Sequence, residues 1–313
     1  MDYDVVVVGG GAAGLTAAVY LARSRRRVVV VDAGDPRNAP SAHLHGFLSR
    51  DGTPPAELLA AGREEVAGYG GEVITDRVLG VEHVGEHGVV VRLASGPDLT
   101  TRGVLVATGL RDELPEIPGL RERWGNDVLH CPYCHGYEVR DEPIGVLGGD
   151  NRPFTLHQAS LVRQWSPDVV FFPHRIALTA EERERLTARG IRIIDGEVAR
   201  LVAKDAELLS VELAAGQVVP RAAVFIGPRF VPHDELLTGL GCQVDDSGWV
   251  ATDATGRTSV PRVWAAGNVV DSPAQAITAA GAGSVAAIAI NHYLLAEDIE
   301  QAVGVQRAAA KTD

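Results

Sequence analysis

Two of the three cysteines in this 313-residue chain, Cys131 and Cys134, stand two residues apart in a stretch that reads CPYCHG. Such a pair can close a small disulfide ring and open it again, because one sulfur attacks an outside partner while the other resolves the mixed disulfide. The proline, tyrosine, histidine and glycine around the cysteines favour a turn or a helix start over two thiols buried in a core. The spacing therefore predicts a redox-active disulfide.

A zinc site would use the same spacing, but it needs a second pair of ligands. His130 and His135 are too close to the cysteines to supply independent corners of a tetrahedron, and Cys242 stands alone. His43 and His45 form another histidine pair, with no carboxylate or third histidine placed to join them. We therefore predict redox chemistry and no metal site.

A base next to the cysteine pair would take the proton of an attacking thiol. His135 follows the second cysteine directly, and an imidazole titrates near neutral pH, so it can accept that proton without a large pKa shift. His130 is a weaker candidate for the same role. The alternative for His135 is a ring that only packs beside the turn.

The composition bounds the classes of partner and location. A formal charge of −12, a pI near 5.3 and the lack of a basic stripe argue against nucleic acid, because the chain would repel phosphates. The chain shows no secretory signal and no unbroken run of eighteen apolar residues, which predicts no membrane span. Three cysteines without a disulfide framework suit a reducing compartment, so we expect a cytoplasmic protein.

The N-terminal stretch has the pattern of a dinucleotide site. The β-branched run Tyr3–Val8 predicts a strand buried on both faces, and Gly9, Gly11 and Gly14 follow it in the frame G-x-G-x-x-G at the start of a helix. A second strand then ends in Asp32, where an acid can bind the adenosine ribose. Strand, glycines, helix and acid together predict dinucleotide binding.

The chain then alternates loops with regular elements. Asp35–Pro55 is a long loop, which in a compact domain usually carries function. A helix is expected over Glu57–Tyr69, short strands over Val73–Leu93, and a buried strand with a small-residue turn over Val104–Gly109. Prolines then suggest a linker, and we place a domain boundary near Leu114.

A second α/β unit follows, with a helix near Ala180–Arg189. Its strands are expected at Ile144–Leu147, Val169–Phe172, Ile191–Ile194 and Val224–Ile226. Its nucleotide signature is poor: where a fingerprint would need glycines after Gly148, the chain has Asp150 and Pro153, a carboxylate against an incoming pyrophosphate and a residue without an amide. His174-Arg175 offers one guanidinium where a cluster would bind a 2′-phosphate.

The C-terminal region returns to the first domain. A strand is expected over Val260–Asn268, and Ser272 and Pro273 read as the cap and first residue of a helix from Ala274 to about Leu295. The partial positive charge at the start of that helix would stabilise a reduced flavin beside it. The last fifteen residues are expected to fray.

Taken together, the chain resembles a low-molecular-weight thioredoxin reductase over nearly its whole length. The matching motifs, in the order of the family, are Gly9–Gly14 with Asp32, Ala107–Gly109, Cys131–Cys134, Ala265–Asn268 and Gln275–Thr278. The resemblance implies an α/β homodimer with two Rossmann-like three-layer domains. Residues 1–113 plus 246–313 would bind FAD, and the inserted residues 114–245 would form an NADPH-like domain that carries the disulfide.

The resemblance also implies residue roles. Cys134 would lie over the flavin, and Cys131 would exchange with substrate. The residues that would contact FAD are Gly9, Gly11, Ala12, Ala13, Gly14, Asp32, Ala33, Arg37, Asn38, His45, Ala107, Thr108, Gly109, Gly267, Asn268, Gln275 and Ala276.

Three departures separate the chain from ordinary thioredoxin reductases. His135 replaces an acid after the second cysteine, Asn268 replaces the acid of a Gly-Asp pair, and the NADPH fingerprint is broken. These features are similar to those of thioredoxin-reductase-like dithiol oxidases, which close disulfides in small molecules such as gliotoxin and holomycin and pass the electrons to O2, giving H2O2. Two alternatives remain: a thioredoxin reductase that uses NADPH or another donor, and a flavin-based redox sensor without turnover.

Overall fold

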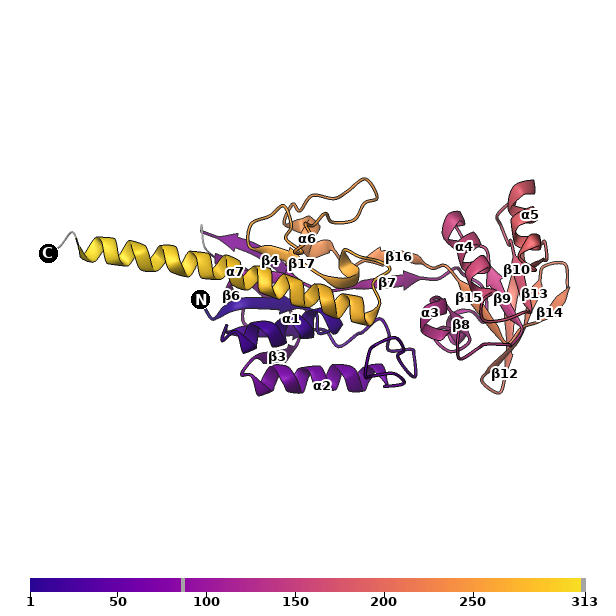
Figure 1. Ribbon diagram of the computed structural model, residues 1–313, viewed down its shortest axis with the longest axis horizontal. Coiled ribbons are helices and arrows are strands. Elements are labelled where there is room, and N and C mark those ends of the chain that lie inside the picture. Colours follow the sequence, from indigo (N-terminus) through magenta and orange to yellow (C-terminus); the bar gives the residue numbers. More distant parts are fainter. Residues whose placement is uncertain (86–87, 311–313) are drawn as a thin grey trace. The chain divides into compact units, whose positions relative to one another are not determined.

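The computed structural model describes residues 1–85 and 88–310, which form two compact units (Figure 1). Unit 1 consists of Met1–Arg37, Ala56–Arg111 and Pro232–Asp313. Unit 2 consists of Asn38–Pro55 and Asp112–Val231. Each contains a parallel sheet, which confirms the α/β class with two Rossmann-like domains. Both units are discontinuous in sequence.

The sheet of unit 1 has the strand order β3-β2-β1-β6-β5-β4, with β17 paired to β6. Its strands are β1 (Tyr3–Val8), β2 (Val28–Asp32), β3 (Glu72–Thr75), β4 (Val78–Val84), β5 (Gly88–Leu93), β6 (Leu99–Val106) and β17 (Val263–Ala265). Strand β5 pairs antiparallel with both β4 and β6, and the other neighbours pair in parallel. Its helical segments are α1 (Ala12–Arg23), α2 (Pro55–Gly68), α6 (Glu235–Gly239), η2 (Gly267–Val269) and α7 (Ala276–Ala309).

Alternate residues of the central strand β1 face two different cores. Val5 and Val7 pack with α1, α2 and α7, whereas Val6 and Val8 pack with β4, β5 and α6. Because successive side chains of a strand point to opposite faces, a run of four valines suits a strand that is covered on both sides. The continuous β-branched pattern therefore led to the correct position for this strand.

The C-terminal helix α7 differs from the sequence expectation at both ends. It begins at Ala276 with Gln275 as its N-cap, so a start at Ala274 with Ser272 as cap is wrong. A turn precedes the helix, because the side-chain amide of Asn268 donates to the carbonyl oxygens before it. The helix also continues to Ala309, so the frayed end is wrong for the described part of the last fifteen residues, and residues 311–313 lie outside that part.

Length and composition would also suit α7 to a membrane span, and within residues 1–85 and 88–310 it is the one helix of that kind. Its small residues, however, are buried against α1. A Cβ on Gly283 would lie 2.1 Å from the carbonyl oxygen of Ala13, so the two helices touch backbone to backbone. Close packing of small residues is found in soluble cores and between membrane helices alike, so the absence of a membrane span stays a prediction.

The sheet of unit 2 has the order β11-β10-β9-β15-β8 and is parallel. Its strands are β8 (Val128–Leu129), β9 (Ile144–Leu147), β10 (Val169–Phe172), β11 (Arg192–Ile193) and β15 (Ala223–Ile226). Its helical segments are η1 (Arg121–Arg123), α3 (Pro132–His135), α4 (Arg152–Val162) and α5 (Ala180–Ala188). The four strands expected from the sequence are present, with β11 shorter than expected.

Unit 2 also contains an antiparallel sheet that the sequence analysis did not predict. It is formed by β12 (Val198–Lys204), β13 (Glu207–Leu213) and β14 (Val218–Pro220). Where the chain passes between the units, β7 (Leu110–Glu113) pairs with β16 (Arg229–Pro232). The stretch Asn38–Pro55 belongs to unit 2 although its sequence neighbours β2 and α2 are in unit 1.

Candidate active site

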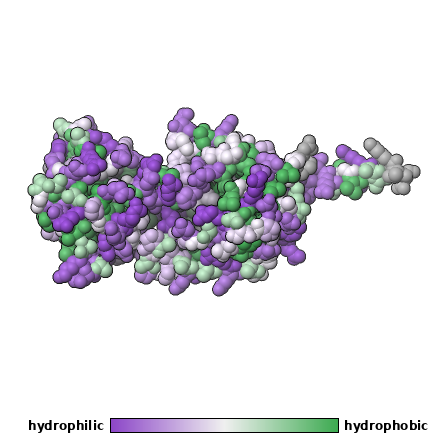
Figure 2. Space-filling view, turned by 180° about the vertical axis from the view of Figure 1, so that it is seen from behind, coloured by the Kyte–Doolittle hydropathy of each residue, from purple (hydrophilic) through white to green (hydrophobic). Residues whose placement is uncertain are grey.

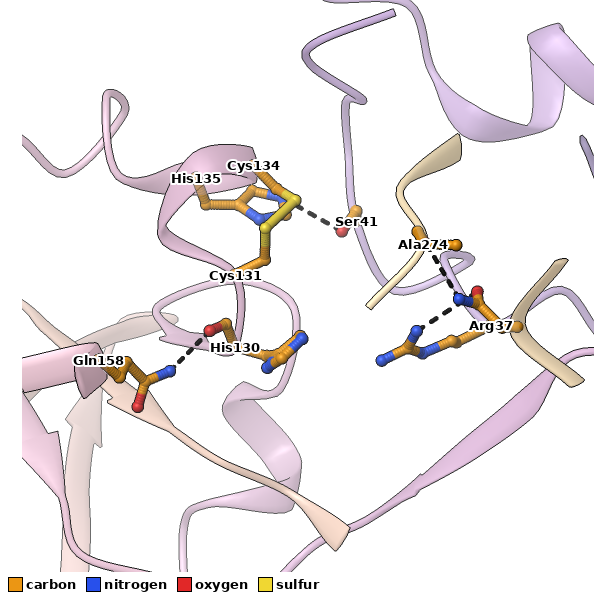
Figure 3. Close-up of a disulfide and its surroundings, with 9 residues drawn as sticks. Arg37, Ser41, His130, Cys131, Cys134, His135, Gln158 and Ala274 are labelled. Carbon is orange, nitrogen blue, oxygen red and sulfur yellow. Dashed lines mark hydrogen bonds between the residues drawn. A yellow bond between two sulfur atoms is a disulfide. The ribbon is translucent and has the colours of Figure 1, made fainter. Parts of the chain in front are cut away.

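The cysteine pair lies at the start of the short helix α3 (Figure 3). Cys131 is the N-cap, and its carbonyl oxygen accepts hydrogen bonds from the amides of Cys134 and His135, both at 3.1 Å. The two cysteines form a disulfide with a Cα–Cα distance of 5.2 Å, and both are half-buried. The predicted disulfide and the helix start around it are therefore present.

A glycine and a tryptophan support this helix from behind. A Cβ on Gly136 would lie 2.8 Å from the ring of Trp165, so only glycine lets that ring pack against the end of α3. Trp165 also meets Tyr133 edge to face, at 5.9 Å between ring centroids. Tyr133, which stands between the cysteines, is nevertheless 65% exposed. The redox helix is thus fixed on one side and open on the other.

His135, the candidate base, is half-buried and hydrogen-bonded. Its Nε2 lies 3.3 Å from Oγ of Ser41, as the dashed line in Figure 3 shows. Burial lowers the pKa of His135 below its ordinary value, and the His45 imidazole lowers it further, while the Glu138 carboxylate acts in the opposite direction. The ring is therefore neutral at neutral pH, the state that a general base requires.

His45 lies between two carboxylates. Its Nδ1 is 3.0 Å from Asp51, and its Nε2 is 3.4 Å from Glu138. The expectation that no carboxylate would join this histidine is therefore wrong, although no group of three potential metal ligands occurs in the described part of the chain. Asn38 and His45 both lie in unit 2, and their proposed contact with FAD stays a prediction.

His130, the weaker candidate base, lies among aromatic rings. Phe154 stacks on it at 5.8 Å, and Phe230 meets it edge to face at 5.1 Å between ring centroids. Its carbonyl oxygen accepts a hydrogen bond from Gln158, which fixes the backbone just before the first cysteine. This position suits a packing residue better than a proton acceptor for substrate.

The glycine-rich turn of unit 1 has the geometry that a pyrophosphate needs. Gly9 has a φ of +106°, and a Cβ on Gly14 would lie 1.9 Å from the carbonyl oxygen of Gly9, so both positions require glycine. The space beside Gly11 is open, and α1 begins at Ala12 and Ala13 without a side-chain cap. The free amides at its start are available to phosphate oxygens.

Asp32, the expected ribose ligand, ends β2 beside this turn. It accepts the backbone amide of Gly10 at 3.1 Å and pairs with Arg63 at 2.7 Å. Each carboxylate oxygen keeps a further lone pair that can accept from a ribose hydroxyl. The exposed residue Ala33 follows it. These residues fit the adenosine half of FAD.

The turn after β6 closes the same region of unit 1. The carbonyl oxygen of Ala107 would lie 2.4 Å from a Cβ on Gly9, so the two turns touch through their backbones. Thr108 donates from Oγ1 to the carbonyl oxygen of His233 at 2.6 Å, and Gly109 has a φ of +71°. Thr108 thus anchors the turn, and Gly109 lets it change direction.

The turn before α7 depends on Asn268. Its Nδ2 donates to the carbonyl oxygens of Asp271, Ser272 and Ala274 at 2.9, 3.2 and 2.9 Å, and Arg37 lies 3.4 Å from its Oδ1. An aspartate has no hydrogen to donate to these carbonyl groups. The departure from Gly-Asp therefore has a structural role here. Gly267, with a φ of +78°, begins η2, and Gln275 and Ala276 begin α7.

The nucleotide-like region of unit 2 is occupied by its own ion pairs. Arg152 forms a bidentate pair with Glu182, and this pairing holds the pKa of Glu182 at about 2. Arg175 binds Glu197 through both Nε and Nη2, at 2.9 and 2.6 Å. Next to it, Nδ1 of His174 accepts the amide of Val198 at 3.0 Å.

The start of α4 is also closed to a phosphate. Asn151 caps the helix by accepting the amide of Phe154 at 3.2 Å, and Pro153 supplies no amide. Asp150 is exposed immediately before the cap. The broken fingerprint predicted from the sequence is therefore found together with side chains that already bind the helix-start amide and the arginines of this region.

Several residues near the disulfide were not singled out from the sequence. Ser41, Asp51 and Glu138 join His45 and His135 around α3. The only signal of Ser41 and Asp51 was the unusual length and polarity of the loop over residues 35–55. No pattern of spacing linked that loop to the cysteines, which follow it by about eighty residues.

Comparisons with known proteins agree with this geometry. The family model of pyridine nucleotide-disulphide oxidoreductases matches residues 3–283. The crystal structure of HlmI is 58% identical, has a TM-score of 0.94 and is matched over 99% of this chain and 96% of its own. Thioredoxin reductase of Streptomyces coelicolor is 31% identical over 94% of each chain. A probable thioredoxin reductase of Arthroderma benhamiae is 39% identical, over 47% of this chain and 38% of its own length.

The chain therefore belongs to the pyridine nucleotide-disulphide oxidoreductase family. Within it, the chain is a thioredoxin-reductase-like flavoprotein, that is, a flavin-dependent thiol/disulfide oxidoreductase with FAD as its cofactor. The resemblance noted from the motifs is confirmed at this level.

Proposed function

We propose that the protein oxidises a small-molecule dithiol to a cyclic disulfide at Cys131–Cys134 and delivers the electrons through FAD to O2. One observation carries this proposal. The cysteine pair is complete and has a neutral histidine beside it, whereas the arginines of the nucleotide-like region, Arg152 and Arg175, are bound to the chain's own carboxylates. Electrons thus have a route in through sulfur, and a nicotinamide nucleotide would have to displace two ion pairs.

The sulfur chemistry balances without a further reactant. One substrate thiol gives its proton to His135, and the thiolate attacks Sγ of Cys131, which breaks the protein disulfide and releases Cys134 as a thiolate. The second substrate thiol attacks the first substrate sulfur, and its proton passes to Cys131, which leaves as a thiol. The cyclic disulfide then leaves, and both cysteines are reduced. The substrate has lost two electrons and two protons.

FAD fits the glycine turn, Asp32 and the uncapped start of α1 in unit 1. When bound, FAD would supply the two-electron acceptor for the reduced cysteine pair and the donor to O2, with H2O2 as the product. Gly9, Gly11 and Gly14 bring the backbone to the pyrophosphate, and Asp32 binds the ribose. Reoxidation restores the disulfide between Cys131 and Cys134 for the next substrate.

Anaerobic mixing of the FAD-loaded enzyme tests the proposal. A simple dithiol such as dithiothreitol should bleach the flavin, and air should restore the yellow colour with formation of H2O2. NADPH should bleach it much more slowly. Rapid bleaching by NADPH would favour the rival function, a thioredoxin reductase. Bleaching by dithiol followed by very slow recovery in air would favour a redox sensor.

The resemblance also leads us to propose a homodimer in the cytoplasm. Apolar side chains on α7 are exposed in the single chain, among them Ile277, Val285, Ile288 and Ile299. Green patches of apolar residues are visible on one face of the molecule (Figure 2). Light scattering should give twice the chain mass of 33.1 kDa.

A further inference from the structure

The stretch Asn38–Pro55 contacts the redox helix although it lies far away in the sequence. Ser41 reaches His135 at 3.3 Å, and His45 reaches Glu138, three residues further along, at 3.4 Å. The loop is itself closed, because the amide of Leu44 donates to the carbonyl oxygen of Thr53 at 2.9 Å. It is therefore a built part of unit 2, next to the disulfide.

We propose that Ser41 is a positioning residue that fixes the tautomer of His135: its Oγ accepts the hydrogen bond from Nε2–H and leaves the lone pair on Nδ1 to take the substrate proton. The catalytic part of this proposal rests on the proposed function, whereas the tautomer is a property of the resting protein.

The assignment follows from the inventory of donors and acceptors. A neutral imidazole has one N–H and one lone pair, so the partner of one nitrogen decides what the other can do. If Ser41 donated instead, the proton of the ring would lie on Nδ1, and the only lone pair would already be occupied by the serine. The accepting arrangement alone leaves a nitrogen of His135 for a substrate thiol.

Burial keeps the ring neutral, against the balance of the charges around it. The groups that face His135 are Ser41 and His45 from the loop and Glu138 from the segment after α3. Glu138 favours the charged ring, but its carboxylate is also bound by Nε2 of His45. His45 in turn is held on its other side by Asp51. The loop therefore supplies both the partner of His135 and the residue that binds its neighbouring carboxylate.

The tautomer can be measured in the oxidised FAD-loaded enzyme, with no substrate or reductant present. Nitrogen NMR of protein with ¹⁵N-labelled histidine separates a protonated from an unprotonated ring nitrogen, and His135→Gln identifies the signals. We expect protonated Nε2 and unprotonated Nδ1 in the wild type. In Ser41→Ala we expect a mixture of the two tautomers.

Kinetics of the dithiol step provide a second readout. Ser41→Ala should slow flavin bleaching by dithiothreitol about tenfold, a part of the ~10²–10⁴-fold that a general base contributes. It should also move the acid limb of the pH–rate profile to lower pH, because an accepted hydrogen bond stabilises the imidazolium more than the neutral ring. Ser41→Thr keeps the hydroxyl and should restore both the bleaching rate and the position of the acid limb. Ser49→Ala is the matched control, an exposed serine of the same loop.

The outcomes separate this inference from the proposed function. Protonated Nδ1 in the wild type overturns the assignment of Ser41, whatever the electron donor is. An unchanged pH profile in Ser41→Ala, with an ordinary rate, also overturns it. If NADPH proves to be the donor but Nε2 is protonated, the positioning by Ser41 stands and the proposed function fails. The wild-type spectrum decides the tautomer even if Ser41→Ala does not accumulate.

Discussion

Cys131 and Cys134 carry the proposed exchange, and each has a separate part in it. Cys131→Ser removes the sulfur that substrate attacks, and Cys134→Ser removes the one that reduces the flavin. Each variant should therefore lose turnover with dithiol and O2, by at least ~10³-fold, while it keeps bound FAD and its yellow colour. Oxygen consumption and the visible spectrum check this. Wild-type turnover in either variant would contradict the exchange scheme.

The pH dependence of the dithiol step should follow the lowered pKa of His135. Burial disfavours the imidazolium, so the ring stays neutral and competent until the pH falls through a pKa below 6.5. The rate should fall on the acid side of that value, with no loss between there and neutrality. The stability effect has the same direction: the unfolded chain binds the proton first, so the stability due to this histidine is lost as the pH falls below about 6.5. Stopped-flow measurement of flavin bleaching between pH 5 and 8 gives the rate of the dithiol step, and urea unfolding over the same range gives the stability. His135→Gln is the control that assigns the acid limb of the rate profile to this histidine.

Asn268, which stands where the family has the acid of a Gly-Asp pair, can be tested by substitution. Its amide donates to three carbonyl oxygens in the turn before α7. Asn268→Asp would place a carboxylate against these oxygens and remove all three bonds. We expect a loss of about 1–3 kcal/mol in the free energy of unfolding and weaker retention of FAD. Unfolding in urea and the FAD content after gel filtration measure the two effects, and unchanged values in both would contradict this role.

At this scale the sequence identified the cysteine pair, the glycine fingerprint and His135, because each depends on neighbours in the chain. Ser41 and Glu138 were missed, since they become important only when a distant loop reaches α3. Asn268 was recognised as unusual, but its donor role needed the carbonyl oxygens around it to be located. Short-range chemistry can be predicted from spacing, whereas contacts between distant segments cannot.

At the scale of elements, α7 shows what holds a long helix in place. Its C-terminal half carries Glu297, which pairs with Arg262 at 2.5 Å and with Arg102 at 3.3 Å. Asp298 follows and pairs with Arg26 and Arg102, each at 2.7 Å. These arginines lie on the sheet or beside it. The sequence expectation ended the helix at Leu295, because no apolar stripe continues and ion pairs to distant arginines leave no local pattern.

Neutralising one member of this network should destabilise unit 1. The Arg262 side chain is 5% exposed and Glu297 is 25% exposed, so Glu297→Gln leaves a buried guanidinium without its full charge partner. We expect a loss of about 2 kcal/mol, below the ~3–5 kcal/mol of a fully buried pair because Glu297 remains partly exposed. Glu300→Gln, an exposed carboxylate on the same helix, should change the stability by less than about 0.5 kcal/mol. Equal urea midpoints for the two variants would contradict the role of the network.

At the scale of the whole molecule, the two α/β units have related architecture but differ at the turn where a nucleotide would bind. Unit 1 keeps the three glycines of the fingerprint and free amides at its turn, and unit 2 has an aspartate, a capping asparagine and a proline at the corresponding place. The sequence showed this difference between the two turns, since a fingerprint is local, and the loss of nucleotide binding in unit 2 stays a prediction. It did not predict that Asn38–Pro55 would belong to unit 2, because membership of a unit depends on contacts and not on position in the chain.

The predicted loss of the second nucleotide site can be tested by binding alone, with 2′,5′-ADP as the probe of a 2′-phosphate site. Its phosphate would have to take Arg175 from Glu197, which binds the guanidinium through two nitrogens. In a calorimetric titration of the wild type with millimolar 2′,5′-ADP, we expect no saturable heat of binding. Glu197→Gln frees Arg175 and should make weak binding measurable, whereas Glu212→Gln, which frees Arg200 on β12, should not. Micromolar binding by the wild type would show that the pair gives way to a nucleotide, and unit 2 would then have kept a working site.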